Sequence, residues 1–98
     1  MTEVVDTFKI HVPGKNRGDI MLYALSTCPW CRKTKELLNH LGVEYDYIDV
    51  NLVKGEEFEN IMKTVLTMDP VSSFPVLVIN GKVIIGYRER QIRKAIKD

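Results

Sequence analysis

Two cysteines lie three positions apart in this sequence of 98 residues, as Cys28-Pro29-Trp30-Cys31, and they are the only cysteines in the chain. A disulfide-stapled secreted domain has about four to eight cysteines spread along its length. In a compartment that keeps thiols reduced, a close pair such as this one indicates redox or metal chemistry instead.

The elements around the pair predict how the two thiols differ. Residues 20–25 are apolar at every position, which is typical of a central strand covered on both faces. Pro29 suits the first turn of a helix, which we expect over residues 29–41 with Gly42 ending it. Cys28 then lies at or next to the helix N-cap, where unpaired N–H groups and the positive end of the helix dipole favour a thiolate. Cys31 lies one turn deeper on the same face, within reach of the Cys28 sulfur.

This arrangement predicts a dithiol exchange reaction. Cys28 attacks a substrate disulfide to form a mixed disulfide, and Cys31 resolves it by attacking Cys28 and releasing the reduced substrate. Pro29 stiffens the turn and removes an N–H donor, and Trp30 is expected to face outward and contact a partner protein.

A metal site would need further ligands, and the sequence offers His11 and His40. His11 belongs to a predicted N-terminal strand, and His40 lies near the far end of the helix that Cys28 begins, too distant at 1.5 Å of rise per residue. We therefore expect no metal within one chain. A metal shared between two chains is left open.

The remaining pattern predicts one α/β domain with the order β-α-β-α-β-β-α and helices on both faces of a mixed four-stranded sheet. Its further elements are strands over residues 45–50, 76–79 and 82–87, an Asn80-Gly81 hairpin turn, and helices over residues 55–68 and 88–97. The helix over residues 55–68 should bury Phe58, Ile61, Met62, Val65 and Leu66. Alternation at Phe8, Ile10 and Val12 predicts an added strand in front, which could form a hairpin with the strand that follows it.

Composition excludes several classes of protein. With 45% apolar and 28% charged residues the chain is neither disordered nor low in complexity. A formal net charge of +1 makes no electrostatic case for a nucleic-acid partner. Apolar runs are far shorter than the roughly 20 residues that cross a bilayer, and residues 1–12 lack the apolar stretch of a signal peptide. We expect a cytoplasmic monomer.

Several strings in the chain resemble the glutaredoxin family of the thioredoxin superfamily. These strings are Tyr23-Ala24-Leu25-Ser26-Thr27-Cys28-Pro29-Trp30-Cys31, Phe74-Pro75-Val76, Asn80-Gly81-Lys82 and Gly86-Tyr87. The resemblance covers residues 19–98 and leaves residues 1–18 as an N-terminal extension. It implies a thioredoxin-like fold, a Cys28 nucleophile, a Cys31 resolving thiol and no cofactor besides this pair. X–Pro bonds are mostly trans, but the resemblance implies that Pro75 is cis.

Departures from the family pattern argue against glutathione as the reductant. Leu25 stands where glutathione-using members commonly have a lysine, and Gly86-Tyr87-Arg88 replaces their Gly-Gly pair. The chain is more similar to NrdH-redoxins and short archaeal redoxins. Those relatives imply a thioredoxin-reductase-like or ferredoxin-dependent disulfide reductase upstream, and ribonucleotide reductase or other protein disulfides as substrates. The residues expected to bind substrate are Phe74, Pro75, Gly86, Tyr87 and Arg88.

Two alternatives remain open on the sequence alone. The first is a glutaredoxin that uses glutathione or another small thiol. If the small thiol is an anion, Arg88 is the cation expected to bind it. The second is a module in which Cys28 ligates a [2Fe–2S] cluster shared between chains, which the stiffness of Pro29 disfavours.

Overall fold

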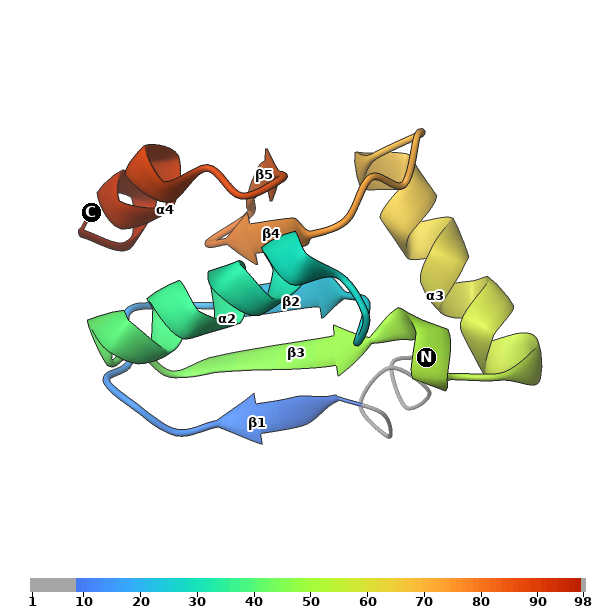
Figure 1. Ribbon diagram of the computed structural model, residues 1–98, viewed down its shortest axis with the longest axis horizontal. Helices are drawn as coiled ribbons and strands as arrows, with labels where there is room; N and C mark the ends of the chain where they lie inside the picture. The colour runs from blue at the N-terminus through green and yellow to red at the C-terminus, as the bar shows by residue number, and fades with distance from the viewer. Residues whose placement is uncertain (1–8, 98) are drawn as a thin grey trace.

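The computed structural model describes residues 9–97, which form a five-stranded mixed sheet with helices on both faces (Figure 1). The strand order is β1-β3-β2-β4-β5. In chain order the elements are β1 (Ile10–Val12), β2 (Ile20–Ala24), α2 (Pro29–Leu41), β3 (Tyr45–Asp49), the short 3₁₀ helix η1 (Val50–Leu52), α3 (Gly55–Met68), β4 (Val76–Ile79), β5 (Lys82–Ile85) and α4 (Glu89–Lys97). The predicted α/β architecture is confirmed, including the added N-terminal strand.

The pairing of the central strands brings three chain segments to one end of the sheet, the end at which β2 and β3 finish. β2 and β3 are parallel, with Ala24 opposite Asp49, so the loops that follow both strands leave at the same end. β4 runs antiparallel to β2, with Val76 opposite Tyr23, so the chain that precedes β4 arrives there too. Cys28, η1 and Pro75 are therefore neighbours although they are far apart in sequence.

Two apolar layers hold the helices against the sheet. On one face, α2 and α4 pack on β2 and β4, and on the other face α3 packs on β2 and β3. Leu22, Leu38, Leu77 and Ile92 are fully buried in the first layer, and Ile61, Val65 and Val76 in the second. α2 begins at the end of the sheet where β2 and β3 finish. The packing along the length of α2 holds its first turn at that place.

β1 does not form a hairpin with β2, which corrects one expectation. It pairs antiparallel with β3, with Ile10 opposite Tyr47 and Val12 opposite Tyr45. β2 is flanked by β3 and β4 and has no free edge to offer. The connecting loop is held against the chain between α2 and β3, because Lys15 N–H donates to Gly42 O at 2.9 Å and Glu44 N–H donates to Lys15 O at 2.8 Å. Phe8 lies outside the described residues, and the proposed boundary between residues 1–18 and 19–98 stays a prediction.

Other corrections concern the ends and faces of elements. The strand expected over residues 82–87 ends at Ile85, because Gly86 has a φ of +86° and turns the chain out of the sheet. The strand expected over residues 45–50 ends at Asp49, where η1 begins, and the last helix begins at Glu89 rather than at Arg88. In α3, Phe58 and Leu66 are exposed, since the sheet covers only the stripe around Ile61 and Val65.

None of the helices within residues 9–97 has the length and apolar character needed to cross a membrane.

Candidate active site

Cys28 occupies the N-cap of α2, as predicted. Its backbone is extended, with φ −92° and ψ 117°, and Pro29 takes the first helical position. The Cys28 sulfur accepts a hydrogen bond from the backbone N–H of Cys31 at 3.2 Å. This N–H is one of those that the first turn of a helix leaves without an intrahelical partner, so the helix end offers it to an anion at this position. A hydrogen-bond donor is therefore already in place at the Cys28 sulfur, while the side chain stays partly exposed.

Cys31 is fully buried behind Cys28, and both thiols are free. Burial raises the pKa of the Cys31 thiol to about 12, and the hydrogen bond and negative charge of the neighbouring Cys28 add to that rise. The charge of Lys35 and a hydrogen bond involving the backbone of Leu25 oppose it. Cys31 is therefore a protonated thiol in the reduced protein.

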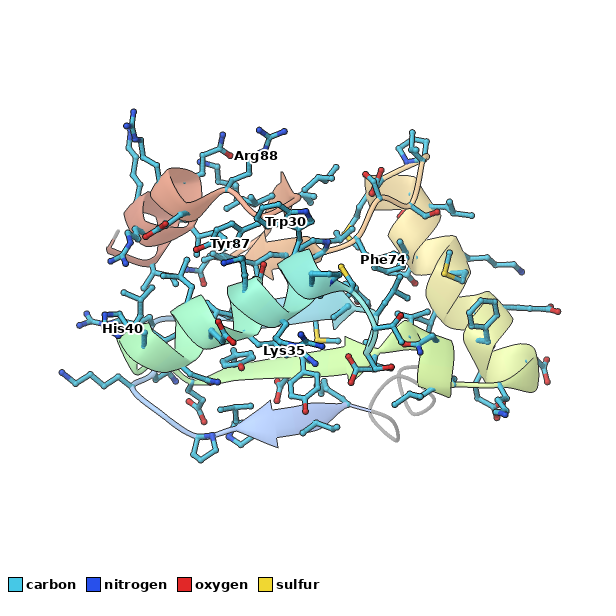
Figure 2. All side chains as sticks on the ribbon, in the orientation of Figure 1. Trp30, Lys35, His40, Phe74, Tyr87 and Arg88 are labelled. Carbon is cyan, nitrogen blue, oxygen red and sulfur yellow. The ribbon has the colours of Figure 1, made fainter. Side chains whose placement is uncertain are left out.

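Lys35 is a site residue that the sequence reasoning missed. It follows Cys31 by one helical turn and points from α2 toward β3 (Figure 2). Its ammonium nitrogen lies 3.0 Å from Asp49 Oδ1 and 4.1 Å from the centroid of the Tyr47 ring. The i, i+4 spacing from Cys31 was the available signal, but the partner across the sheet was not deducible from spacing.

A pair of hydrogen bonds fixes the loop that leads to Cys28, and this feature was also missed. Asn51 in η1 accepts from the Ser26 backbone N–H and donates to the Ser26 hydroxyl, both at 2.8 Å. The Cys28 backbone N–H donates to Leu25 O at 3.2 Å, closing a turn. These hydrogen bonds hold η1 against residues 25–28, which we call the cysteine loop, at the end of the sheet where β2 and β3 finish.

A groove of about 270 Å³ lies at the start of α2. Trp30 and Tyr87 stack in it, with ring centroids 5.8 Å apart and an interplanar angle of 22° (Figure 2). Trp30 is 55% exposed, so it faces outward as predicted. The residues that line the groove are Trp30, Phe74, Gly86, Tyr87 and Arg88. Four of the five residues predicted to bind substrate are thus brought together with Trp30.

Pro75, the fifth, lies behind the groove at the start of β4. The Phe74–Pro75 peptide bond is cis, as the resemblance implies, and Pro75 is buried. Its carbonyl accepts a hydrogen bond from the Gly86 N–H at 2.8 Å. This bond joins the segment before β4 to the segment after β5, so Phe74 and Tyr87 approach the helix start from adjacent strands.

The two histidines lie away from the cysteines. His40 is near the opposite end of α2 (Figure 2). His11 is on β1, against Glu44 and Asp46. Within residues 9–97, no group of three or more His, Cys, Asp or Glu side chains is arranged to hold a metal ion.

Comparison with known proteins identifies the family. The glutaredoxin family model matches residues 20–84. The chain belongs to the glutaredoxin family. Its structure is similar to that of the glutaredoxin from Methanosarcina mazei Go1, with a TM-score of 0.83 and 43% identity over 92% of this chain and 88% of that one. It is also similar to methanoredoxin from Methanosarcina acetivorans, with a TM-score of 0.82 and 46% identity over 87% of this chain and 90% of that one.

A curated relative is the glutaredoxin-like 8.6 kDa protein in a rubredoxin operon of Clostridium pasteurianum. It is 35% identical over 78 residues, which cover 80% of this chain and 97% of the relative. The predicted thioredoxin-like fold is thus confirmed, and this glutaredoxin-family chain is a thiol-disulfide oxidoreductase with a Cys-x-x-Cys pair. Glutaredoxin-like proteins act on disulfide substrates together with a reductase partner.

Proposed function

We propose that this chain is a dithiol redoxin of the NrdH type that reduces disulfides in other proteins, with ribonucleotide reductase as an example of such a substrate. The observation that supports it best is the depth difference between the two thiols. Cys28 is partly exposed on the helix N-cap, and Cys31 is buried behind it with its N–H on the Cys28 sulfur. This is the arrangement that attack followed by internal resolution requires.

The proposed cycle balances without a cofactor. The Cys28 thiolate attacks one sulfur of the substrate disulfide, the other sulfur leaves as a thiolate and takes a proton from water, and a mixed disulfide forms. The Cys31 thiol loses its proton and attacks Cys28, which forms the Cys28–Cys31 disulfide and releases the second substrate thiol. Two electrons have passed to the substrate, and an upstream reductase restores them.

The protonation states suit this order of events. Before attack, burial and the neighbouring Cys28 keep the pKa of Cys31 high, so Cys31 does not compete for the substrate. After attack, Cys28 is neutral and the cation of Lys35 remains, so the Cys31 thiolate becomes easier to form at the step that needs it.

The groove supports a protein substrate over glutathione. Leu25 packs against the apolar layer beneath α3, so no cation stands at that point of the cysteine loop. Tyr87 stacks on Trp30 and fills space after Gly86. An exposed tryptophan beside a nucleophile is suited to contact with a partner protein. We accordingly propose a thioredoxin-reductase-like or ferredoxin-dependent reductase as the electron source, and a monomer that acts in the cytoplasm, where thiols are kept reduced.

Insulin reduction tests the reaction. The wild-type protein should accelerate the precipitation of insulin chains in dithiothreitol, Cys28→Ser should abolish the acceleration, and Cys31→Ser should accumulate a mixed disulfide visible by mass spectrometry. Full activity of Cys28→Ser would contradict the proposed roles.

The reductant is tested separately on the oxidised protein. Thiols are counted after incubation with NADPH and thioredoxin reductase, with ferredoxin-thioredoxin reductase and reduced ferredoxin, or with NADPH, glutathione and glutathione reductase. We expect one of the first two systems to restore both thiols. Rapid turnover with glutathione would instead support the small-thiol alternative, with Arg88 as the group that binds the glutathione carboxylate.

A further inference from the structure

Positive charge is concentrated at α4 in a chain whose formal net charge is only +1. Arg88 precedes the helix, and Arg90, Arg93 and Lys94 are on it, all of them exposed. Other elements carry acidic residues, for example Glu56 in the first turn of α3 and Asp46 on β3. Glu89 in the first turn of α4 is paired with Arg93, so the surface at α4 is net positive but not uniformly basic.

The helix dipole explains only part of this concentration. Cations near the C-terminus of a helix are favourable, which accounts for Arg93 and Lys94. Arg88 and Arg90 are at the N-terminal end of α4, where the same dipole disfavours positive charge. The helix dipole therefore does not account for these two charges.

The surface that these residues line is continuous with the active-site groove. Arg88 lines the groove itself, beside Trp30 and Tyr87 (Figure 2). A second hollow of about 410 Å³ is lined by Glu89, Arg90 and Arg93. A third hollow of about 550 Å³, away from the cysteines, shares Arg93 with the second. The residues that line it are Arg17, Leu41, Val43, Arg93 and Ile96. We call the exposed side chains of Arg17, Arg88, Arg90, Arg93 and Lys94 the α4 surface.

Two of these arginines are held in position by contacts that use only their Nε atoms. Arg88 Nε donates to Ile85 O at 3.2 Å, and Arg93 Nε donates to Glu89 Oε2 at 2.9 Å. A guanidinium has five N–H donors, and its two terminal NH₂ groups match a carboxylate in a bidentate pair. Arg88 and Arg93 therefore present oriented carboxylate-binding groups at small further cost in side-chain entropy.

We propose that the α4 surface docks an acidic segment of the partner protein whose disulfide reacts at Cys28, an inference that rests on the proposed function. The acidic segment lies along α4, while the disulfide enters the groove at Trp30 and Tyr87. Complementary charge of this kind raises the rate of encounter and orients the partner before the exchange.

An acidic protein segment fits this surface better than a nucleic acid. The third hollow has an aliphatic floor of Leu41, Val43 and Ile96, which suits apolar side chains next to carboxylates. Glu89 stands among the arginines and repels a phosphate and a carboxylate alike, so it does not distinguish the two kinds of partner. The aliphatic floor does, because a protein segment brings apolar side chains to it and a phosphate backbone does not.

The test compares two synthetic peptides that each contain the same internal disulfide, one flanked on both sides by glutamates and the other by glutamines. Second-order rates of their reduction by the reduced protein are measured by stopped flow at increasing NaCl concentration. We expect the acidic peptide to react about tenfold faster at low salt, at the lower end of what electrostatic steering achieves. The two rates should converge as salt shortens the screening length below about 10 Å.

Charge reversal locates the effect. Arg90→Glu/Lys94→Glu should remove the advantage of the acidic peptide and leave the glutamine peptide unchanged, and Arg90→Gln/Lys94→Gln should give an intermediate rate. The matched control is Lys63→Glu/Lys82→Glu, which makes the same change in net charge at exposed sites on α3 and β5 and should retain the advantage.

The contrary outcomes are distinct. Equal low-salt rates for the two peptides with wild-type protein, or equal loss in the α4 variant and its control, would overturn the docking inference alone. Reduction of neither peptide would overturn the proposed function and this inference with it. Salt-sensitive binding of a labelled single-stranded RNA that requires Arg90 and Lys94 would assign the surface to nucleic acid and overturn the acidic-partner proposal.

Discussion

Lys35 and Asp49 form an ion pair across the interface between α2 and β3, with 3.0 Å between Nζ and Oδ1 and both side chains mostly buried. The pair ties the helix that begins at Cys28 to the strand that leads into η1. It also places a fixed cation one helical turn after Cys31, where its charge lowers the pKa of that thiol against the larger effect of burial.

Replacing Lys35 with methionine should slow the resolving step. The pKa of Cys31 rises when the cation is removed, so less thiolate is present at any given pH and the rate profile shifts to higher pH. At neutral pH we expect a loss of up to about tenfold in the resolving rate. Ellman's reagent measures it, because attack by Cys28 releases a first thionitrobenzoate and attack by Cys31 releases a second. Lys33→Met, exposed on the same helix, is the control, and identical second phases in the two variants would refute the role of Lys35.

Iodoacetamide should label one thiol of the folded, reduced protein near neutral pH. Cys31 is fully buried and burial raises its pKa to about 12, so its thiolate is scarce and inaccessible. Mass spectrometry should find a single carbamidomethyl group, on Cys28, and two groups after unfolding in guanidinium. Early labelling of Cys31 in the native protein would show that the difference in depth does not control reactivity.

The Trp30–Tyr87 stack should contribute a measurable coupling energy. Aromatic pairs add about 0.5–1.5 kcal/mol beyond area burial, and we expect the lower end because Trp30 is 55% exposed. Urea unfolding of Trp30→Ala, Tyr87→Ala and the double variant gives this energy as a double-mutant cycle. Strictly additive losses would mean that the rings touch without stabilising each other.

Stability should fall as pH rises through the titration of His11. Nδ1 lies 2.8 Å from Asp46 Oδ1 and Nε2 lies 2.9 Å from Glu44 Oε2, and since carboxylates only accept, both contacts require the doubly protonated ring. The hydrogen bond to Asp46 is the largest cause that raises the pKa of His11 above 6.5. The stabilisation is therefore complete below the unfolded value of 6.5 and is lost as pH passes the raised folded value.

The measurement is the free energy of unfolding of wild type and His11→Gln from pH 5.5 to pH 8.5, roughly one unit on the acid side of the ordinary histidine pKa and two on the other. The difference between the two proteins should shrink with rising pH. A constant difference would mean that His11 contributes by packing rather than by charge.

Local features of this protein were predictable from sequence because neighbouring residues determine them. The N-cap position of Cys28 follows from the apolar run before it and from Pro29 after it. The end of α2 follows from Gly42, which adopts a φ of +71°. The Asn80-Gly81 turn likewise has positive φ at both residues, 50° and 84°, as a two-residue hairpin requires.

Other features depended on which strands become neighbours, and no local pattern encodes that. β1 pairs with β3 because β2 has both edges occupied, and only that sheet order sets Asp49 beneath Lys35. Tyr87 reaches Trp30 because β5 ends at Ile85 and Gly86 turns the chain toward the start of α2. Sequence alone thus determined the reactive cysteine pair and the helix end that supports it. Tertiary structure decided the surroundings of that pair, because its contacts join residues that only the packing of sheet and helices brings together.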